Sequence, residues 1–139
     1  MKLDGHGKWG EFTITPQRVV VGKAADLDEL EDPKCKGWAP VWVYVNAKLV
    51  GDAPMTGPMV MSDTGVLLAG DVPVQRLLIL GLDLSSKPAD CEDDDPDALW
   101  QKGEDHTRCA PYLVPEGKAI SSITYSRGYY QPPRKWTVQ

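Results

Sequence analysis

Side chains that could carry out catalysis are few and scattered in this sequence of 139 residues. Nucleophilic catalysis needs a general base beside the nucleophile, and the two histidines, His6 and His106, stand in no pattern that supplies one. The sequence contains no G-x-S-x-G motif, and the serine pairs at 85–86 and 121–122 are interpreted as ordinary loop and strand residues. The sequence therefore predicts a protein that is not an enzyme.

The three cysteines indicate a disulfide. Cys35, Cys91 and Cys109 show neither C-x-x-C spacing nor nearby histidines, which argues against a zinc site. Because Cys91 and Cys109 bracket an acidic stretch that burial could hardly order, we expect a bridge between them, worth about 3 kcal/mol, and an oxidising compartment. The alternative is three separate buried thiols in a cytosolic protein. Cys35, between two lysines, is expected to be exposed and unpaired.

Two segments offer metal ligands, and a copper- or calcium-binding domain is the alternative function. The segment Met55 to Met61 holds three methionines, whose thioethers could join a histidine around copper. Methionines are more often core residues, however. The acidic run at 92–97 offers oxygen ligands for calcium but lacks the alternating spacing and central glycine of a calcium loop. Asp93 and Asp95 in this run are the residual candidates for acid–base chemistry, and no cofactor is expected.

The charge pattern argues against nucleic acid as a partner. The formal net charge is -5, and residues 90–108 alone carry eight acids against two bases. Four bases and no acid lie within residues 118–139, but without a basic helix or an arginine cluster. The acidic balance would repel a polyphosphate, so nucleic-acid binding is not expected.

The apolar runs are too short to span a membrane, because the longest, at 77–80, is closed by Gly81 and Asp83. Met1 to Gly5 lacks the apolar region of a signal peptide, so we expect any export signal to lie outside this chain. The segment 5–10 matches G-x-G-x-x-G, but without the preceding strand and following helix that a dinucleotide site requires. Residues 1–10 are therefore interpreted as a flexible lead-in.

From residue 11 onward the sequence predicts one domain of short strands. The longest runs from Pro40 to Val50, where Val41 and every second residue to Leu49 would face the core, and Trp42 and its alternates the other way. Further strands are expected at 11–15, 19–21, 74–82 and 135–138, with hairpins over 60–68 and 105–125. Residues 24–31 and 95–100 could form short helical turns. This pattern predicts an all-β antiparallel sandwich of seven to nine strands over 11–139.

Several segments together resemble an uncharacterised group of secreted or lipid-anchored actinobacterial proteins with an immunoglobulin-like β-sandwich. They are "VVVGKAADLDELE" at 19–31, "GWAPVWVYVNAKLV" at 37–50, "CAPYLVPEGKAISSITY" at 109–125 and the terminal "KWTV". The resemblance implies that Cys91 and Cys109 are paired and that a tether holds the domain outside the membrane. It supplies no catalytic residues. The tyrosine two residues before the second cysteine of an antibody-type domain is missing, because Thr107 stands there.

The last candidate is a surface near the C-terminus. Residues 128–134 place Tyr129, Tyr130 and Arg134 in one connection with two prolines, a composition common in protein interfaces. The alternative is that both tyrosines lie back on the sandwich. The sequence thus predicts a secreted or cell-surface, non-catalytic interaction module, with these three residues binding another protein of the cell envelope.

Overall fold

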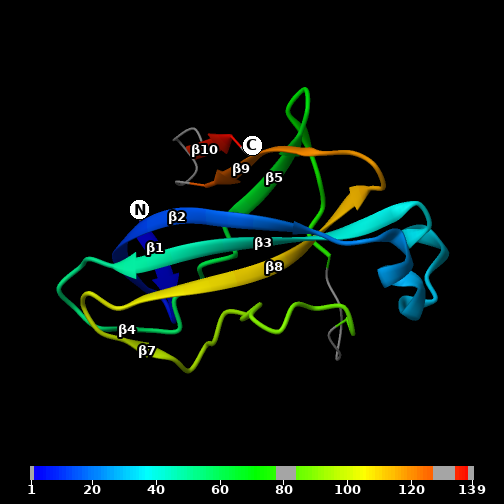
Figure 1. The fold of residues 1–139 in the computed structure, drawn as a ribbon. Coiled ribbons are helices and arrows are strands. Elements are labelled where there is room, and N and C mark those ends of the chain that lie inside the picture. The colour runs from blue at the N-terminus through cyan, green and yellow to red at the C-terminus, as the bar shows by residue number, and fades with distance from the viewer. Residues whose placement is uncertain (1, 78–83, 127–133, 138–139) are drawn as a thin grey trace.

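The computed structural model describes residues 2–77, 84–126 and 134–137, and it is built almost entirely of antiparallel strands (Figure 1). The elements are β1 (Lys2–Gly5), β2 (Lys8–Val21), η1 (Ala24–Leu30), η2 (Pro33–Cys35), β3 (Trp38–Leu49), β4 (Met55–Thr56), β5 (Thr64–Leu68), β6 (Val72–Pro73), β7 (Leu99–Trp100), β8 (Asp105–Pro115), β9 (Ile120–Tyr125) and β10 (Arg134–Thr137). The short helical turn predicted at 24–31 is present as the 3-10 helix η1. No helix in the described ranges is long and apolar enough to cross a membrane.

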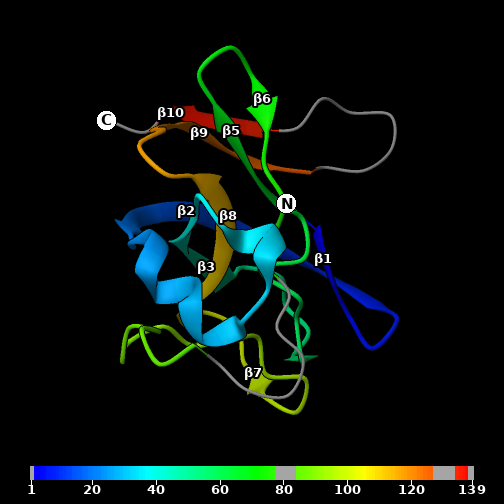
Figure 2. The same ribbon diagram turned by 90° about the vertical axis from the view of Figure 1, so that its right-hand side faces the viewer.

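Two four-stranded sheets form the body of the protein. The first has the order β1-β2-β3-β8 and the second the order β10-β9-β5-β6, while β4 and β7 form a small pair of their own. Figure 2 shows the second sheet lying over one side of the first, with η1 on the other side. The expectation of an all-β antiparallel sandwich is confirmed. Its narrower description as immunoglobulin-like stays a prediction.

Strand β3 is the centre of the first sheet, as its length and alternation predict. It pairs with β2 on one side and with β8 on the other. Val43, Val45, Ala47 and Leu49 are fully buried between the two sheets, because side chains two residues apart on a strand share one face. We call this cluster the inner core. Its buried members are Leu3, Phe12, Ile14, Val43, Val45, Ala47, Leu49, Met55, Val60, Met61, Val66, Trp100, Ala110, Tyr112, Ile123 and Tyr125.

The opposite face of β3 is buried as well, but only over part of its length. Trp42 and Tyr44 point away from the inner core, as expected, and are 3% and 1% exposed. They belong to a second cluster, which lies beneath η1 and the segment 84–93. We call η1 together with this segment the cover. This outer cluster contains Leu27, Trp42, Tyr44, Leu77, Leu84, Cys91 and Cys109.

Residues 2–10 are a β-hairpin, so the prediction of a flexible lead-in over 1–10 is wrong there. β1 pairs with β2 from Lys2 opposite Glu11 to Gly5 opposite Lys8. A Cβ on Gly5 would lie 2.4 Å from the carbonyl oxygen of Thr56. The glycine that suggested flexibility is needed here for close packing of the hairpin against β4.

Three predicted local structures differ in the fold. β8 and β9 follow each other through a tight turn, as expected, but β8 pairs with β3 and β9 pairs with β5 and β10. The turn therefore carries the chain from one sheet to the other rather than closing a hairpin. Residues 95–100 form a turn and strand β7 instead of a helical turn, and residues 60–63 are not a strand. Of the strand expected at 74–82, residues 78–82 lie outside the described ranges, and Arg76 forms a bridge to Tyr112 on β8.

Candidate functional site

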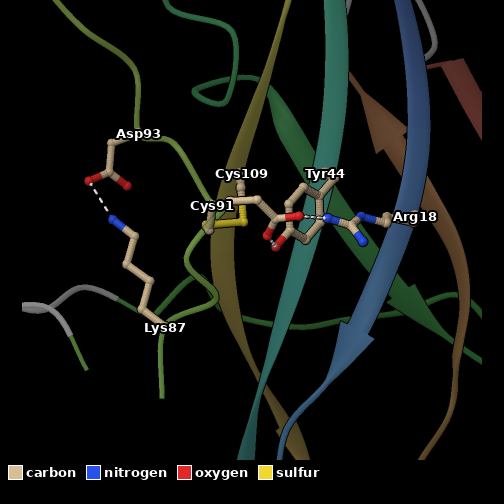
Figure 3. Close-up of a disulfide and its surroundings, with 7 residues drawn as sticks. Arg18, Tyr44, Lys87, Cys91, Asp93 and Cys109 are labelled. Carbon is tan, nitrogen blue, oxygen red and sulfur yellow. Dashed lines mark hydrogen bonds and ion pairs between the residues drawn. A yellow bond between two sulfur atoms is a disulfide. The ribbon is translucent and has the colours of Figure 1, made fainter. Parts of the chain in front are cut away.

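A disulfide joins the cover to the first sheet. The sulfurs of Cys91 and Cys109 are 2.11 Å apart and the two Cα atoms 5.1 Å apart, which confirms the predicted pairing. Cys109 lies on β8 beside Tyr44, and its backbone N–H donates to the carbonyl oxygen of Glu92 at 2.9 Å. Figure 3 shows the disulfide between β8 and the segment that crosses it. Both cysteines are buried, at 5% and 1% exposed.

Beside the disulfide, a buried tyrosine, an arginine and an aspartate form one contact. The hydroxyl of Tyr44 donates to Oδ1 of Asp90 at 2.8 Å, and Arg18 pairs with the other oxygen of that carboxylate. The guanidinium carbon of Arg18 lies 4.1 Å from the centre of the Tyr44 ring, an attractive cation–π geometry (Figure 3). Three segments that are distant in sequence meet here, at β2, β3 and the cover.

The protonation of this contact follows from its geometry. Burial, followed by the hydrogen bond to Asp90, raises the pKa of Tyr44 to about 12. The hydrogen bond from Tyr44, followed by that from Arg18, lowers the pKa of Asp90. At neutral pH the tyrosine is therefore a neutral donor and the aspartate an ionised acceptor, which suits a structural contact and not a general acid–base pair.

The acidic run that suggested calcium is dispersed among different partners. Glu92 pairs with Arg108 at 2.9 Å and Asp93 with Lys87 at 3.1 Å. Asp94 accepts hydrogen bonds from the backbone N–H groups of residues 60 and 61 at 3.2 and 3.0 Å, while burial raises the pKa of its carboxyl. Across residues 2–77, 84–126 and 134–137, no three histidine, cysteine or acidic side chains gather as potential metal ligands.

The methionines of the copper alternative differ in burial, and its two histidines contact other residues. Met55 and Met61 are buried in the inner core, and Met59 is 41% exposed. His6 Nε2 is 2.6 Å from the carbonyl oxygen of residue 96. The ring of His106 lies 4.5 Å from that of Trp100, and its Nε2 is 3.2 Å from a carboxylate oxygen of residue 104.

Cys35 is free, as predicted, but half-buried rather than exposed. It ends η2 and packs against the outer cluster. Together with Ala24 and Leu27 of η1 it lines a surface pocket whose remaining wall includes Asp28 and Asp32. No sequence signal indicated this packing, because the neighbouring lysines suggested exposure.

The predicted C-terminal binding residues are described only in part. Tyr129 and Tyr130 lie outside the described residues. Arg134 is exposed at the start of β10, opposite Tyr125, while the next residue, Lys135, pairs with Asp71 at 2.6 Å. The prediction of a protein-binding surface there remains a prediction, with Arg134 placed on an edge strand.

A different surface combines hydrogen-bonding groups from three strands, and sequence reasoning missed it. Beyond the cover, the outer face of the first sheet continues in two rows of directly paired residues, whose side chains share that face. The rows are Thr15–Asn46–Thr107 and Thr13–Lys48–Asp105. We call these residues, with Gln17 and Trp9 at the two ends, the open face.

Hydrogen bonds fix the open face in place. Nδ2 of Asn46 donates to Oδ2 of Asp105 at 2.9 Å and to the hydroxyl of Thr107 at 3.2 Å. That hydroxyl donates to Oε1 of Gln17 at 3.3 Å. The network spans β2, β3 and β8, so its polar groups are held in a defined arrangement.

Trp9 lies on the same side of β2 as Thr13. Gly10 faces Met55, so its neighbour Trp9 points away from the inner core, and the indole is 65% exposed. The sequence signal was the polar half of each strand's alternation, Thr13 with Thr15 and their counterparts on β3. The strand prediction places that half only on the side away from the core.

Comparison of this chain with protein-family models, with curated proteins and with solved structures finds no match. The expected resemblance to secreted or lipid-anchored actinobacterial proteins therefore stays a prediction. The geometry of the disulfide, the cover and the open face is what supports the assignment that follows.

Proposed function

We propose that this chain is a non-catalytic binding module that works outside the cytoplasm, either secreted or held at the cell surface. The buried Cys91–Cys109 bond is the observation that carries the proposal. Disulfides of this kind form and persist in oxidising compartments and are rare in the cytosol. Here the bond attaches the cover to the sheet, so the closure of this face depends on that chemistry.

The use of the titratable groups supports a role without catalysis. Catalytic groups combine a shifted pKa with an accessible cleft and a partner for proton transfer. In this fold the shifted groups fasten parts of the chain together. Tyr112 donates to the carbonyl oxygen of residue 64 at 3.0 Å and Tyr125 to that of residue 60 at 2.5 Å, and burial raises the pKa of both phenols.

Binding is proposed for the open face, with the C-terminal surface around Arg134 as the second contact. The open face presents polar groups from three paired strands and an exposed indole, whereas the cover occupies the rest of that sheet surface. A rigid sheet that carries exposed side chains is a suitable platform for recognition, because little conformational freedom is lost on binding. An immunoglobulin-like arrangement of the two sheets would fit such a platform.

The compartment is tested by thiol trapping in intact cells of the source organism. Free thiols are alkylated before lysis, and the protein is then reduced, labelled with a second reagent and mapped by mass spectrometry. We expect Cys91 and Cys109 to carry the second label and Cys35 the first. Both bridging cysteines carrying the first label would place the protein in a reducing compartment and overturn the proposal.

The binding role is tested by saturable capture. The purified domain, immobilised through a tag, is exposed to envelope extract and to a separate polysaccharide fraction, and retained material is tested again in purified form. A dissociation constant that weakens with Arg134→Ala or with Thr13→Ala supports a binding module on the corresponding surface. Turnover of retained material, or no saturable binding of either fraction, contradicts it.

A further inference from the structure

We propose that the open face binds an uncharged polysaccharide chain, with Trp9 as a stacking platform and the Gln17–Thr107–Asn46 network as its hydrogen-bonding partner. This inference rests on the proposed binding function and adds the class of ligand. It is argued from the chemistry of these side chains, from their order along the sheet and from the balance of charge.

The polar network has the groups that recognise hydroxyl pairs. Sugars present neighbouring hydroxyls, each both donor and acceptor, and planar amides and carboxylates can engage two of them together. The internal bonds of the open face use Nδ2 of Asn46, one oxygen of Asp105 and Oε1 of Gln17. Within the described residues they leave the Oδ1 of Asn46 as acceptor and the Nε2 of Gln17 as donor for a ligand.

Trp9 supplies what the network lacks, an exposed aromatic surface. One side of a sugar ring carries only C–H groups, and such a surface packs on an indole face while the hydroxyls stay hydrated or bonded. At about 3.3 Å per residue, Trp9 lies about 13 Å along β2 from Thr13. The platform and the first row of the open face are thus separated by more than one sugar ring, so the surface fits a chain and not a single sugar.

The charges of the open face favour an uncharged ligand. Lys48 stands directly opposite Asp105 on the neighbouring strand, so the two charges of that row oppose each other. Glu11, between Trp9 and Thr13 on the same side of β2, adds one acid to this surface. The whole chain has a formal net charge of -5, which disfavours an anionic polymer. A cationic peptide would need an acidic patch or an apolar pocket, and the row Thr15–Asn46–Thr107 carries neither charge nor a large apolar group.

The test is affinity electrophoresis and intrinsic tryptophan fluorescence with defined probes. The probes are soluble β-glucan, xylan and mannan, insoluble cellulose and chitin by sedimentation, and polygalacturonate with single-stranded DNA as anionic controls. We expect saturable binding of at least one uncharged polysaccharide that survives 1 M salt, because the contacts are not ionic.

Matched variants locate the site. Trp9→Ala should weaken that binding by roughly tenfold or more, as truncation of an aromatic hot spot does, and Gln17→Ala by a smaller factor. Trp38→Ala is the control, because Trp38 is 36% exposed but lies at the far end of β3 from the open face. Both test residues are exposed, and circular dichroism with thermal unfolding checks that each variant folds.

Two outcomes would overturn the inference. They are an absence of binding to every uncharged probe, and binding that Trp9→Ala and Gln17→Ala leave unchanged. Binding of the anionic controls alone, lost at high salt, would also contradict it. If a purified envelope protein is still captured in any of these cases, the proposed binding function stands and only the ligand class is wrong.

Discussion

The two faces of β3 are buried by different means. On the inner side, Val43 and Val45 meet the apolar side chains of a second sheet. On the outer side, Trp42 and Tyr44 lie beneath a short 3-10 helix and a segment with little apolar surface. That cover is fastened by a disulfide and by ion pairs to Arg18 and Arg108.

The difference shows how a small β-domain can bury a second face without a third sheet. Burial of apolar area contributes roughly 25 cal/mol per Å², so a layer rich in aspartate gains little by that route. A covalent bond and ion pairs to Arg18 and Arg108 supply specific anchors instead. We therefore expect the inner core to set global stability and the anchors to set whether the cover stays closed.

The largest effect is expected from truncating the inner core. Trp100 is 1% exposed and meets Phe12 edge to face at 5.7 Å. Trp100→Ala should lower the free energy of unfolding by about 3–5 kcal/mol, because it removes a large side chain and leaves a cavity. Urea unfolding measures this, and Trp9→Ala, at a residue that is 65% exposed, should cost about 0.5 kcal/mol or less. Similar losses in the two variants would contradict the contrast between buried and exposed tryptophans.

The disulfide should come next, and its loss should act on one face. Replacing Cys91 and Cys109 together by alanine should cost about 3 kcal/mol, the value for closing a loop of this size. Hydrogen exchange should show lost protection at the N–H of residue 109, which bonds to the cover, and retained protection in β5 and β9. Equal loss of protection in both sheets would show that the two faces unfold as one unit.

Asp94, directly after the cover segment 84–93, tests the contact between this part of the chain and residues 60 and 61 of the inner core. Asp94→Ala leaves the backbone N–H groups of Val60 and Met61 without their acceptor and should cost about 2 kcal/mol by thermal or urea unfolding. Asp93→Ala is the matched control, since its ion pair with Lys87 is exposed on the aspartate side and such pairs contribute about 0–1 kcal/mol. A larger loss for Asp93 than for Asp94 would overturn this account of the cover.

The smallest effect is a change in acid sensitivity. The pKa of Asp90 is lowered from 3.8 by Tyr44 and Arg18, so its contact stabilises the fold above that value and is lost as the pH falls below it. Asp94 has a raised pKa and therefore the opposite sign: ionising its buried carboxyl costs stability as the pH rises through that pKa, while its two acceptor bonds remain. Asp90→Asn should reduce the difference between the melting temperatures at pH 7 and pH 3. An undiminished difference would show that other carboxyls govern acid unfolding.

The sequence predicted the features that depend on local alternation or on composition. The nine-residue alternation around Val45 was enough to identify β3 as a central strand, and the position of Cys91 and Cys109 around an acidic stretch was enough to predict their bond. Both signals are contained in one segment, so no tertiary information was needed to interpret them.

Prediction from the sequence failed where the partner of a residue lies far away along the chain. Aspartates that looked solvated are anchored, because Asp90 meets Arg18 seventy-two positions earlier. Glycine at position 5 suggested freedom, yet a Cβ there would meet the backbone carbonyl oxygen of Thr56. The turn after β8 has the same residues whether it closes a hairpin or crosses between sheets, so only the packing of Tyr112 and Ile123 into one core decides. The open face was missed for a related reason, because its rows exist only once three strands are in register.

β2 contains a bulge where its pairing with β3 shifts, and this bulge affects whether copies of the protein can aggregate through the edge of β2. Beyond Glu11, within the described residues, no strand pairs with the edge of β2 that faces away from β3, and such an edge is a template for aggregation. The pairing shifts between Pro16 and Arg18, and Pro16 has no N–H to donate. An incoming strand in register with Thr13 would therefore be out of register with Val19. The edge can accept at most a short segment, which opposes the growth of fibrils from the folded state.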